Sequence, residues 1–448
     1  MPERLQDKPV RYLIGICLAA IFIAAAAVRL YPLIVSSAEK ENGVLFFADS
    51  KLYATLAYNI YYGKGFSVTA TSDKGETNRP FFNRPPGYPF FMASIMSIFE
   101  RYYPLDVFRV VCIIQGILDA FCCLLVFLLA RMFSRRSVVL PLISSALYSL
   151  CPYSIYYTRA ILVESLTAFL LTMFVLLAVT GISRKQLRWF FYAGLFLGFL
   201  ILIRPEYLLF VIVFALFLLI THRRDKRFFL RILAVYLAGI MITVLPWSAR
   251  NYLLSKRPIL VSIGVLDSNL YYGTFENRNT WRGYTHVANI DFIDAEEKTE
   301  AALLQRTYFD KFNKGDIDEI LALEKECKKL ALRRIFARPF QTISNWIIKI
   351  PNLWYQNNIV MYRGEPGGIF FIFYFIFAVY AFLMTRGPAR TLMGLIVTLF
   401  IYLTIFFVPL HVEPRFSIPL LPSINCLAGI GIGMFFNKLK NRIWVGHR

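Results

Sequence analysis

The sequence is poor in charged residues and in the motifs of soluble catalytic sites. Only 17% of its 448 residues are charged, and its seven cysteines and four histidines show neither zinc-site nor disulfide spacing. It has no Walker loop, no glycine-rich dinucleotide-binding motif and no HExxH sequence. These absences exclude the common nucleotide-binding and zinc-protease classes. No metal ligand set is assigned, and no cofactor is firmly predicted.

Apolar residues dominate instead. Hydrophobic residues form 57% of the chain and the mean hydropathy is +0.54, which is typical of multi-pass membrane proteins. The net charge of +21 would favour nucleic acid as the partner of a soluble domain, but lysine and arginine in cytoplasmic loops produce the same excess. We therefore expect an integral membrane protein, in contact with membrane lipids, that binds no nucleic acid.

About ten apolar runs have the length of a membrane-spanning helix, and each must be helical because hydrocarbon offers backbone amides no other partner. The first favours an uncleaved anchor over a signal peptide because it continues beyond Arg29. The fifth and sixth are separated only by "IRPE", so one long broken helix is an alternative to two spans. The runs lie near residues 12–35, 105–130, 138–156, 160–182, 189–203, 206–221, 228–247, 367–385, 391–409 and 416–436.

Basic residues mark every second connection between these runs. After a basic N-terminus they recur as "RMFSRRS" at 131, "SRKQLR" at 183, "HRRDKR" at 222, "TRGPAR" at 385 and "NKLKNR" at 437. Cytoplasmic loops of membrane proteins carry such an excess, so both termini are predicted to be cytoplasmic. We divide the chain into an N-terminal transmembrane catalytic core (1–247), an extracytoplasmic helical region (248–366) and C-terminal transmembrane helices (367–448).

The predicted outer side carries two long loops, residues 36–104 and 248–366. Loops of this length are usually functional. In the second loop, apolar residues recur every three or four positions at 294–312 and 316–336. This spacing predicts two amphipathic helices packed on the outer face of the membrane.

Ionisable side chains gather at the outer ends of the predicted helices and in the first outer loop. Such groups are costly near hydrocarbon and persist mainly where they pair or line a wet cavity. We therefore expect one cavity at the outer leaflet, built from segments far apart in sequence. The candidates are Asp49, Arg79, Arg84, Tyr157, Arg159, Glu164, Arg204, Glu206, Arg250, His411, Glu413 and Arg415.

This set suits a phosphorylated lipid as ligand. Guanidinium groups bind phosphate oxygens bidentately and keep their charge, which makes Arg84, Arg204, Arg250 and Arg415 the candidates for phosphate binding. A carboxylate in the same cavity can act as general base on an acceptor hydroxyl, and Asp49 is the candidate. The aromatic residues around Asp49 either form an interfacial belt or stack on a sugar.

Two polar residues lie deeper in the apolar runs. We expect Arg29 to snorkel to the outer interface. Asp119, with Gln115 one turn away, is expected to make a buried polar contact with a neighbouring helix. Its alternative role is in an ion pathway, from which a transporter would start.

Six motifs follow one another along the chain: "ADSKLYATLAYNIYYGKGFS", "RPPGYPFFMA", "TRAILVESLTAFLLT", "LIRPEYLLF", "PWSARNYLL" and "HVEPRFSIPLLP". This ordered set resembles the GT-C glycosyltransferases. The nearest branch contains the dolichyl-phosphate-mannose-protein mannosyltransferases and the lipid A aminoarabinose transferase.

The resemblance implies an all-α polytopic membrane enzyme. Such an enzyme transfers a sugar from a polyprenyl phosphate to an envelope lipid, glycan or protein on the extracytoplasmic face, with inversion at the anomeric carbon. We expect it in the plasma (inner) membrane of a prokaryote. By position, Asp49 matches the catalytic acid of the first outer loop, and the arginines of the later motifs match positions near the donor phosphate. We assign Tyr53, Tyr88, Arg159, Glu206, His411 and Glu413 to the substrate cavity.

The sequence departs from this family at one catalytic position. Many relatives carry an acidic pair where this chain reads Asp49-Ser50, so the second catalytic carboxylate falls to Glu164 or Glu413. The sequence also leaves open whether a divalent cation binds near His411 and Glu413. Two other functions fit parts of the pattern: a transporter or flippase of a lipid-linked or anionic substrate, and an O-antigen ligase or polymerase.

Overall fold

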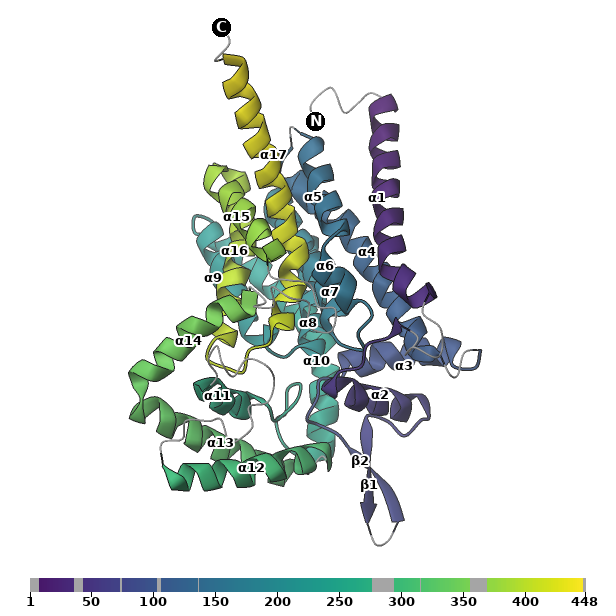
Figure 1. The fold of residues 1–448 in the computed structure, drawn as a ribbon, viewed down its shortest axis with the longest axis vertical. Helices are drawn as coiled ribbons and strands as arrows, with labels where there is room; N and C mark the ends of the chain where they lie inside the picture. Colours follow the sequence, from purple (N-terminus) through teal and green to yellow (C-terminus); the bar gives the residue numbers. More distant parts are fainter. Residues whose placement is uncertain are drawn as a thin grey trace.

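The computed structural model describes residues 8–35, 43–72, 75–102, 106–135, 137–275, 294–314, 316–354 and 369–445. Within these residues the chain is almost entirely helical (Figure 1). Six helical segments there are long and apolar enough to cross a membrane. They are α1 (Lys8–Val35), α4 (Val107–Phe133), α7 (Glu164–Arg184), α10 (Lys226–Ser255), α16 (Pro388–Phe407), and the 3₁₀ helix η4 (Pro414–Leu420) continued by α17 (Leu421–Val445).

Shorter apolar helices accompany these spans. They are α3 (Gly87–Phe99), α5 (Val139–Ser149), α8 (Leu187–Ile203), α9 (Tyr207–Thr221) and α15 (Ile369–Met384). Every predicted apolar run coincides with one of these elements, although the third is divided into α5 and α6 (Pro152–Tyr157). The prediction of an all-α polytopic membrane fold is confirmed.

Helices α8 and α9 are two antiparallel helices and not one broken helix. Gly194 of α8 lies so close to α10 that a Cβ there would stand 2.2 Å from the Tyr236 carbonyl oxygen, and Gly198, one turn later, meets Thr243. Helices α8 and α10 therefore run in the same direction, and α9 must return between them. The ring of His222, just past α9, accordingly lies 6.4 Å from Phe190 near the start of α8.

The two predicted outer loops lie at one end of the molecule, opposite the start of α1 and the end of α17 (Figure 1). The first loop forms α2 (Ala48–Tyr61), an antiparallel hairpin that pairs Ser67 with Pro80, and α3. The strands of this hairpin are β1 (Ser67–Ser72) and β2 (Gly75–Pro80). The second loop forms α11 (Leu266–Phe275), α12 (Ala295–Lys314), α13 (Ile317–Ala337) and α14 (Pro339–Trp354).

The two amphipathic helices predicted in the second loop are α12 and α13. Their apolar residues meet α11 and the first loop in a small core that includes Phe81, Tyr271 and Leu330. Arg334 of α13 forms a buried ion pair with Glu297 of α12, with Nη1 2.8 Å from Oε1. This pairing satisfies both charges where α12 and α13 meet.

The expectation that Arg29 snorkels to the interface is wrong. Its side chain is fully buried, and Nε lies 2.6 Å from Oδ2 of Asp119 on α4. Arg29 also donates to the carbonyl oxygen of Ser149 at 2.9 Å, and Tyr148 donates to Oδ1 of Asp119 at 2.6 Å. Because a counter-charge and acceptors lie within reach, the guanidinium stays inside. The predicted buried contact of Asp119 with a neighbouring helix is confirmed.

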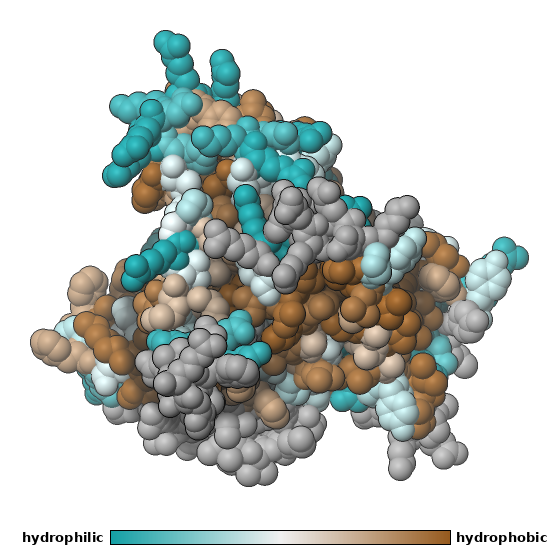
Figure 2. All heavy atoms as spheres, turned by 90° about the horizontal axis from the view of Figure 1, so that it is seen from above, coloured by the Kyte–Doolittle hydropathy of each residue, from teal (hydrophilic) through white to brown (hydrophobic). Residues whose placement is uncertain are grey.

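Apolar side chains also cover much of the molecular surface. Viewed from the end at which α1 starts, a broad hydrophobic area lies beside clusters of hydrophilic residues (Figure 2). Exposed aliphatic side chains occur on several of the long apolar helices, among them Ile23 of α1, Ile242 of α10 and Ile405 of α16. This exposure fits helices that face lipid.

Candidate active site

Asp49 stands in the first turn of α2, and the residues around it are fixed to the segment before α7. Leu45 pairs with Ala160 in an isolated parallel bridge. The buried hydroxyl of Ser50 accepts from Phe47 N at 2.9 Å and donates to the Ile161 carbonyl oxygen at 2.9 Å. Ser50, the position at which an acidic partner is common in the resembled family, thus holds the start of α2 in place.

Gln115 of α4 also holds the segment before α7 in place. Its Nε2 donates to the carbonyl oxygens of Thr158 and Ala160 at 3.2 and 2.9 Å, and its Oε1 accepts from the Tyr88 hydroxyl at 2.7 Å. The Tyr88 ring in turn packs edge-on against Tyr53 of α2, with ring centroids 5.2 Å apart. Burial raises the pKa of Tyr53 to about 12, so its hydroxyl keeps its proton.

Arg84 and Arg204 are brought together by a close helix contact. Arg84 precedes α3, whose Gly87 packs against the end of α8: a Cβ there would lie 2.9 Å from the Leu202 carbonyl oxygen. Arg204 follows at the end of α8 in an extended conformation. A larger residue than glycine would push apart the two segments that carry these arginines.

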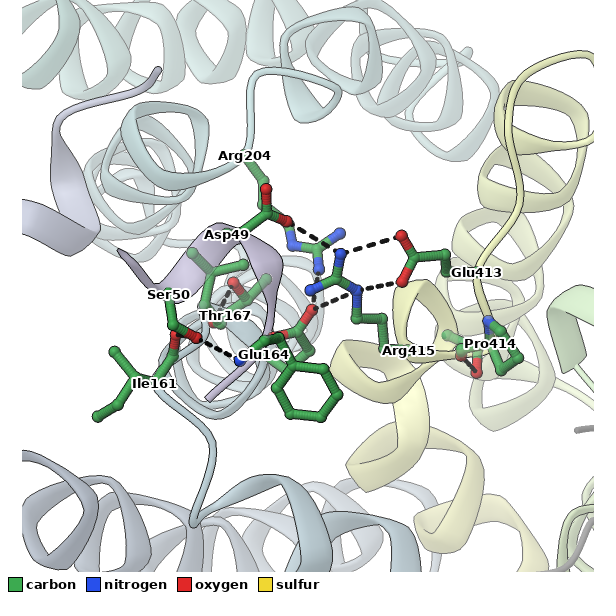
Figure 3. A network of polar contacts seen from close by, with 12 residues as sticks. Asp49, Ser50, Ile161, Glu164, Thr167, Arg204, Glu413, Pro414 and Arg415 are labelled. Atoms are coloured by element: carbon green, nitrogen blue, oxygen red, sulfur yellow. Dashed lines mark hydrogen bonds and ion pairs between the residues drawn. The ribbon is translucent and has the colours of Figure 1, made fainter. Parts of the chain in front are cut away.

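The carboxylates and guanidiniums of five chain segments form one connected cluster. Figure 3 shows part of it, with Asp49, Glu164, Arg204, Glu413 and Arg415. Asp49 lies between Arg84 (Oδ1 to Nη2, 2.6 Å) and Arg415 (Oδ2 to Nη2, 3.0 Å). Arg415 also pairs with Glu413 (Nε to Oε2, 2.6 Å). We call Asp49, Arg84, Glu164, Arg204, Glu206, Glu413 and Arg415 the ion-pair cluster.

Arg204 holds the other end of this cluster. Its Nη2 lies 2.9 Å from Oε1 of Glu164 and its Nη1 lies 3.0 Å from Oε1 of Glu206. The same Glu164 oxygen is 3.9 Å from Nε of Arg415 and so connects the two arginines. The Phe416 ring lies 5.5 and 5.8 Å from the guanidinium carbons of Arg204 and Arg415, a distance suited to cation–π attraction.

The arginines keep the accessible carboxylates of the cluster ionised. Burial favours the neutral form of Asp49, but the guanidiniums of Arg84 and Arg415 outweigh it and hold the pKa of Asp49 below its ordinary value. Burial is likewise outweighed at Glu413, where Arg415 and His411 lower the pKa. The Asp49 side chain is 25% exposed, so a ligand from outside can reach it.

Other predicted residues lie next to the cluster or apart from it. His411 Nε2 stands 3.3 Å from Oε1 of Glu413. Arg159 packs over the Tyr156 ring at 5.6 Å. Arg250 packs over Trp247 at 4.7 Å and donates to the carbonyl oxygens of Phe66 and Phe81. Arg159 and Arg250 thus make their contacts elsewhere.

Two of the remaining candidates lie outside the cluster as well. Arg79 lies exposed on β2, and the Tyr157 ring stacks on Phe47 at 6.1 Å. Across the described residues, no three His, Cys, Asp or Glu side chains are grouped so as to hold a metal ion.

The roles of three residues of the site were not predicted from the sequence. Phe416 has no signal beyond its position after Arg415. Ser50 is the third residue of α2, a position from which a polar side chain can accept from the backbone amide of the N-cap residue, as Glu or Gln does in a capping box. Gln115 was noticed only as the neighbour of Asp119.

Solved structures share this arrangement of helices. AglB, the archaeal oligosaccharyltransferase from Archaeoglobus fulgidus in complex with an inhibitory peptide and a dolichol-phosphate, matches 98% of this chain with a TM-score of 0.58 and 12% sequence identity. ArnT from Cupriavidus metallidurans, bound to undecaprenyl phosphate, matches 93% with a TM-score of 0.50 and 14% identity. This chain has the GT-C glycosyltransferase fold.

A sequence comparison agrees with the fold over part of this GT-C chain. Residues 83–249 match the family described as dolichyl-phosphate-mannose-protein mannosyltransferase, and the resemblance predicted from the motifs is confirmed. The match includes Arg84, Glu164 and Arg204 and ends before Glu413 and Arg415. A search of curated protein sequences finds no match. The chain spans 52% of the AglB chain and 60% of the ArnT chain.

Proposed function

We propose that this GT-C protein is a membrane glycosyltransferase. It transfers a sugar from a polyprenyl-phosphate donor to a hydroxyl of a lipid, glycan or protein on the extracytoplasmic face. The observation that carries the proposal is Asp49, an accessible carboxylate held between Arg84 and Arg415 in a cluster of guanidiniums. The solved AglB and ArnT structures contain dolichol-phosphate and undecaprenyl phosphate, which supports a lipid phosphate as ligand.

The donor phosphate binds Arg84, Arg204 and Arg415 by replacing carboxylates that now pair with their guanidiniums. Each of these guanidiniums is already paired with a carboxylate, so a phosphate that binds Arg415 competes with Asp49 and Glu413 for the same N–H groups. Guanidinium forks suit phosphate oxygens and remain charged in a dry site. Arg250 has no part in this binding, because its N–H groups serve backbone carbonyls.

This exchange also activates the base. In the resting cluster the two arginines keep the pKa of Asp49 low, which makes its carboxylate a weak base. When the phosphate binds the guanidinium of Arg415, Asp49 loses a cation that stabilises its ionised form. The pKa of Asp49 therefore rises. Donor arrival therefore increases the basicity of the residue that must accept the acceptor proton.

The transfer then proceeds in one displacement. The acceptor oxygen attacks the anomeric carbon as its proton passes to Asp49, and the bond between that carbon and the phosphate oxygen breaks. Polyprenyl phosphate leaves with the electron pair, and Arg204 and Arg415 stabilise its charge. Attack in line with the leaving group inverts the anomeric carbon.

The orientation follows from the distribution of basic residues. The connections rich in lysine and arginine are cytoplasmic, as are both termini, so the end that carries α2 and α11–α14 faces outward. A bacterial or archaeal plasma membrane is the setting. Asp119, from which a transporter would start, has both carboxylate oxygens engaged by Arg29 and Tyr148, which fits a structural contact.

The test is sugar transfer by the full chain reconstituted in vesicles with a radiolabelled polyprenyl-phosphate sugar and a membrane extract. We expect Asp49→Asn to lower the rate by about 10² to 10⁴, the usual range for a general base. The matched control is Asp106→Asn. It removes another carboxylate, on the residue before α4 and paired with Arg109 of that helix, and should leave transfer near the native rate. Comparing anomeric couplings of donor and product by NMR tests inversion.

Two outcomes would contradict the proposal. Full transfer by the Asp49→Asn variant would remove the role given to Asp49. Movement of labelled lipid across the vesicle membrane without a new glycosidic bond would replace the enzyme with a transporter.

A further inference from the structure

Helix α14 presents an apolar face that no described part of the chain covers. Phe340, Ile343, Ile347 and Ile350 are all exposed, Phe340 to 88%. Their spacing of three and four residues puts them on one side of the helix. A stripe of large apolar side chains on an outer helix marks a contact surface, because water solvates it poorly.

The opposite side of α14 is occupied by protein. Asn345 donates to the Thr274 carbonyl oxygen at 3.3 Å, and the buried Lys349 donates to the carbonyl oxygens of Gly273 and Leu410 at 2.9 and 2.7 Å. These bonds attach α14 to α11 and to the segment that leads to Glu413 and Arg415. The apolar face therefore cannot rotate inward.

The end of α14 lies at the depth of a membrane-spanning helix. Trp354 donates its indole N–H to Thr404 of α16 at 2.9 Å, and its ring stacks on Phe400 at 4.2 Å. Phe400 lies seven residues before the last residue of α16, Phe407, which corresponds to about 10 Å along the helix. Helix α14 therefore descends from the outer layer to the level of the hydrocarbon.

From these contacts we propose that α14 is an interfacial membrane helix whose apolar face rests in the outer leaflet. We infer lipid contact from the position of α14. One side of the helix is bonded to α11, its end packs on α16, and its remaining side is apolar and exposed. A helix of this kind lies with its apolar side about 5–10 Å into the boundary between headgroups and acyl chains. Through Lys349 it anchors the Arg415 segment to the membrane surface. This inference does not depend on the proposed transferase activity.

The depth of a fluorescent label on α14 tests the proposal. Single cysteines replace Ile343 or Ile347 in a Cys17→Ser background, since the other native cysteines are buried. The full chain is labelled and reconstituted in phosphatidylcholine vesicles that contain lipids brominated at different acyl depths. Ile401→Cys on α16 is the reference for lipid contact, and Lys325→Cys on α13 is the reference for water.

We expect brominated lipids to quench the label at Ile343 or Ile347, most strongly when the bromine is shallow, while aqueous iodide quenches it little. The label at Lys325 should show the reverse. Iodide quenching at Ile347 as strong as at Lys325 would overturn the proposal. Protection from both quenchers would also overturn it, because that result indicates that protein, and not lipid, covers this face. Size-exclusion profiles that match the native chain show that each variant is folded.

Discussion

Replacing Asp119 by asparagine should destabilise the protein by about 3–5 kcal/mol, because it leaves the Arg29 guanidinium buried without a counter-charge. Both residues are buried, and Nε of Arg29 lies 2.6 Å from Oδ2 of Asp119. The Tyr148 hydroxyl donates to the other oxygen at 2.6 Å. Neither charge can reach water unless helices separate, so the variant bears the full cost of desolvation.

The assay is equilibrium unfolding in bicelles, followed by tryptophan fluorescence. Asp106→Asn provides the control, because both side chains of its 3.9 Å pair with Arg109 are partly exposed, so the pair should contribute about 1 kcal/mol at most. The double variant R29M/D119L removes both charges and should recover more than half of the loss. A loss near 0.6 kcal/mol for Asp119→Asn, the average of interhelical hydrogen bonds in membranes, would refute this reasoning.

The remaining predictions concern the surroundings of Asp49. Arg84→Gln removes one of the two guanidiniums that lower the pKa of Asp49, so this pKa should rise. On acidification the variant should then lose transfer activity at a higher pH than the native protein does. An unchanged acid limb in the pH profile of kcat/KM would contradict this. Ser50→Ala leaves the Phe47 amide and the Ile161 carbonyl without their buried partner, which should cost about 1–3 kcal/mol in thermal unfolding and lower kcat as Asp49 loses its position.

The membrane architecture could be predicted because the bilayer imposes strong constraints on sequence. A span needs a long apolar run, and cytoplasmic loops need cations, so the apolar runs identified the membrane helices, whereas α3, α11 and α14 in the two long loops were not predicted. The sequence did not decide whether α8 and α9 form one long broken helix or two antiparallel helices. The four residues "IRPE" leave two topologies open, and the close approach of Gly194 to α10 decides between them.

The site was predictable as a group but not as a set of contacts. The cost of ionisable groups near hydrocarbon brought Asp49, Arg204 and Arg415 into one hypothesis, and the structure brings them together. The same rule gave no means of separating Arg250, which serves carbonyl groups, from Arg415, which pairs with acids. Arg29 was misjudged for a related reason, since its partner Asp119 lies 90 residues away in sequence.

The charge balance of the ion-pair cluster determines which of its pairs can open. Its four carboxylates already outnumber its three guanidiniums, and a donor phosphate adds further negative charge, so binding requires a carboxylate to leave its arginine. Glu413 is 36% exposed, and water can solvate it once it is displaced. Glu164 is 1% exposed and would remain charged in a dry site. The Arg204–Glu164 pair therefore stays closed, and Arg204 can exchange only Glu206, whereas Arg415 exchanges its exposed partner Glu413. Asp49 pairs with the same Arg415 that the donor phosphate binds. Donor binding therefore changes the basicity of Asp49.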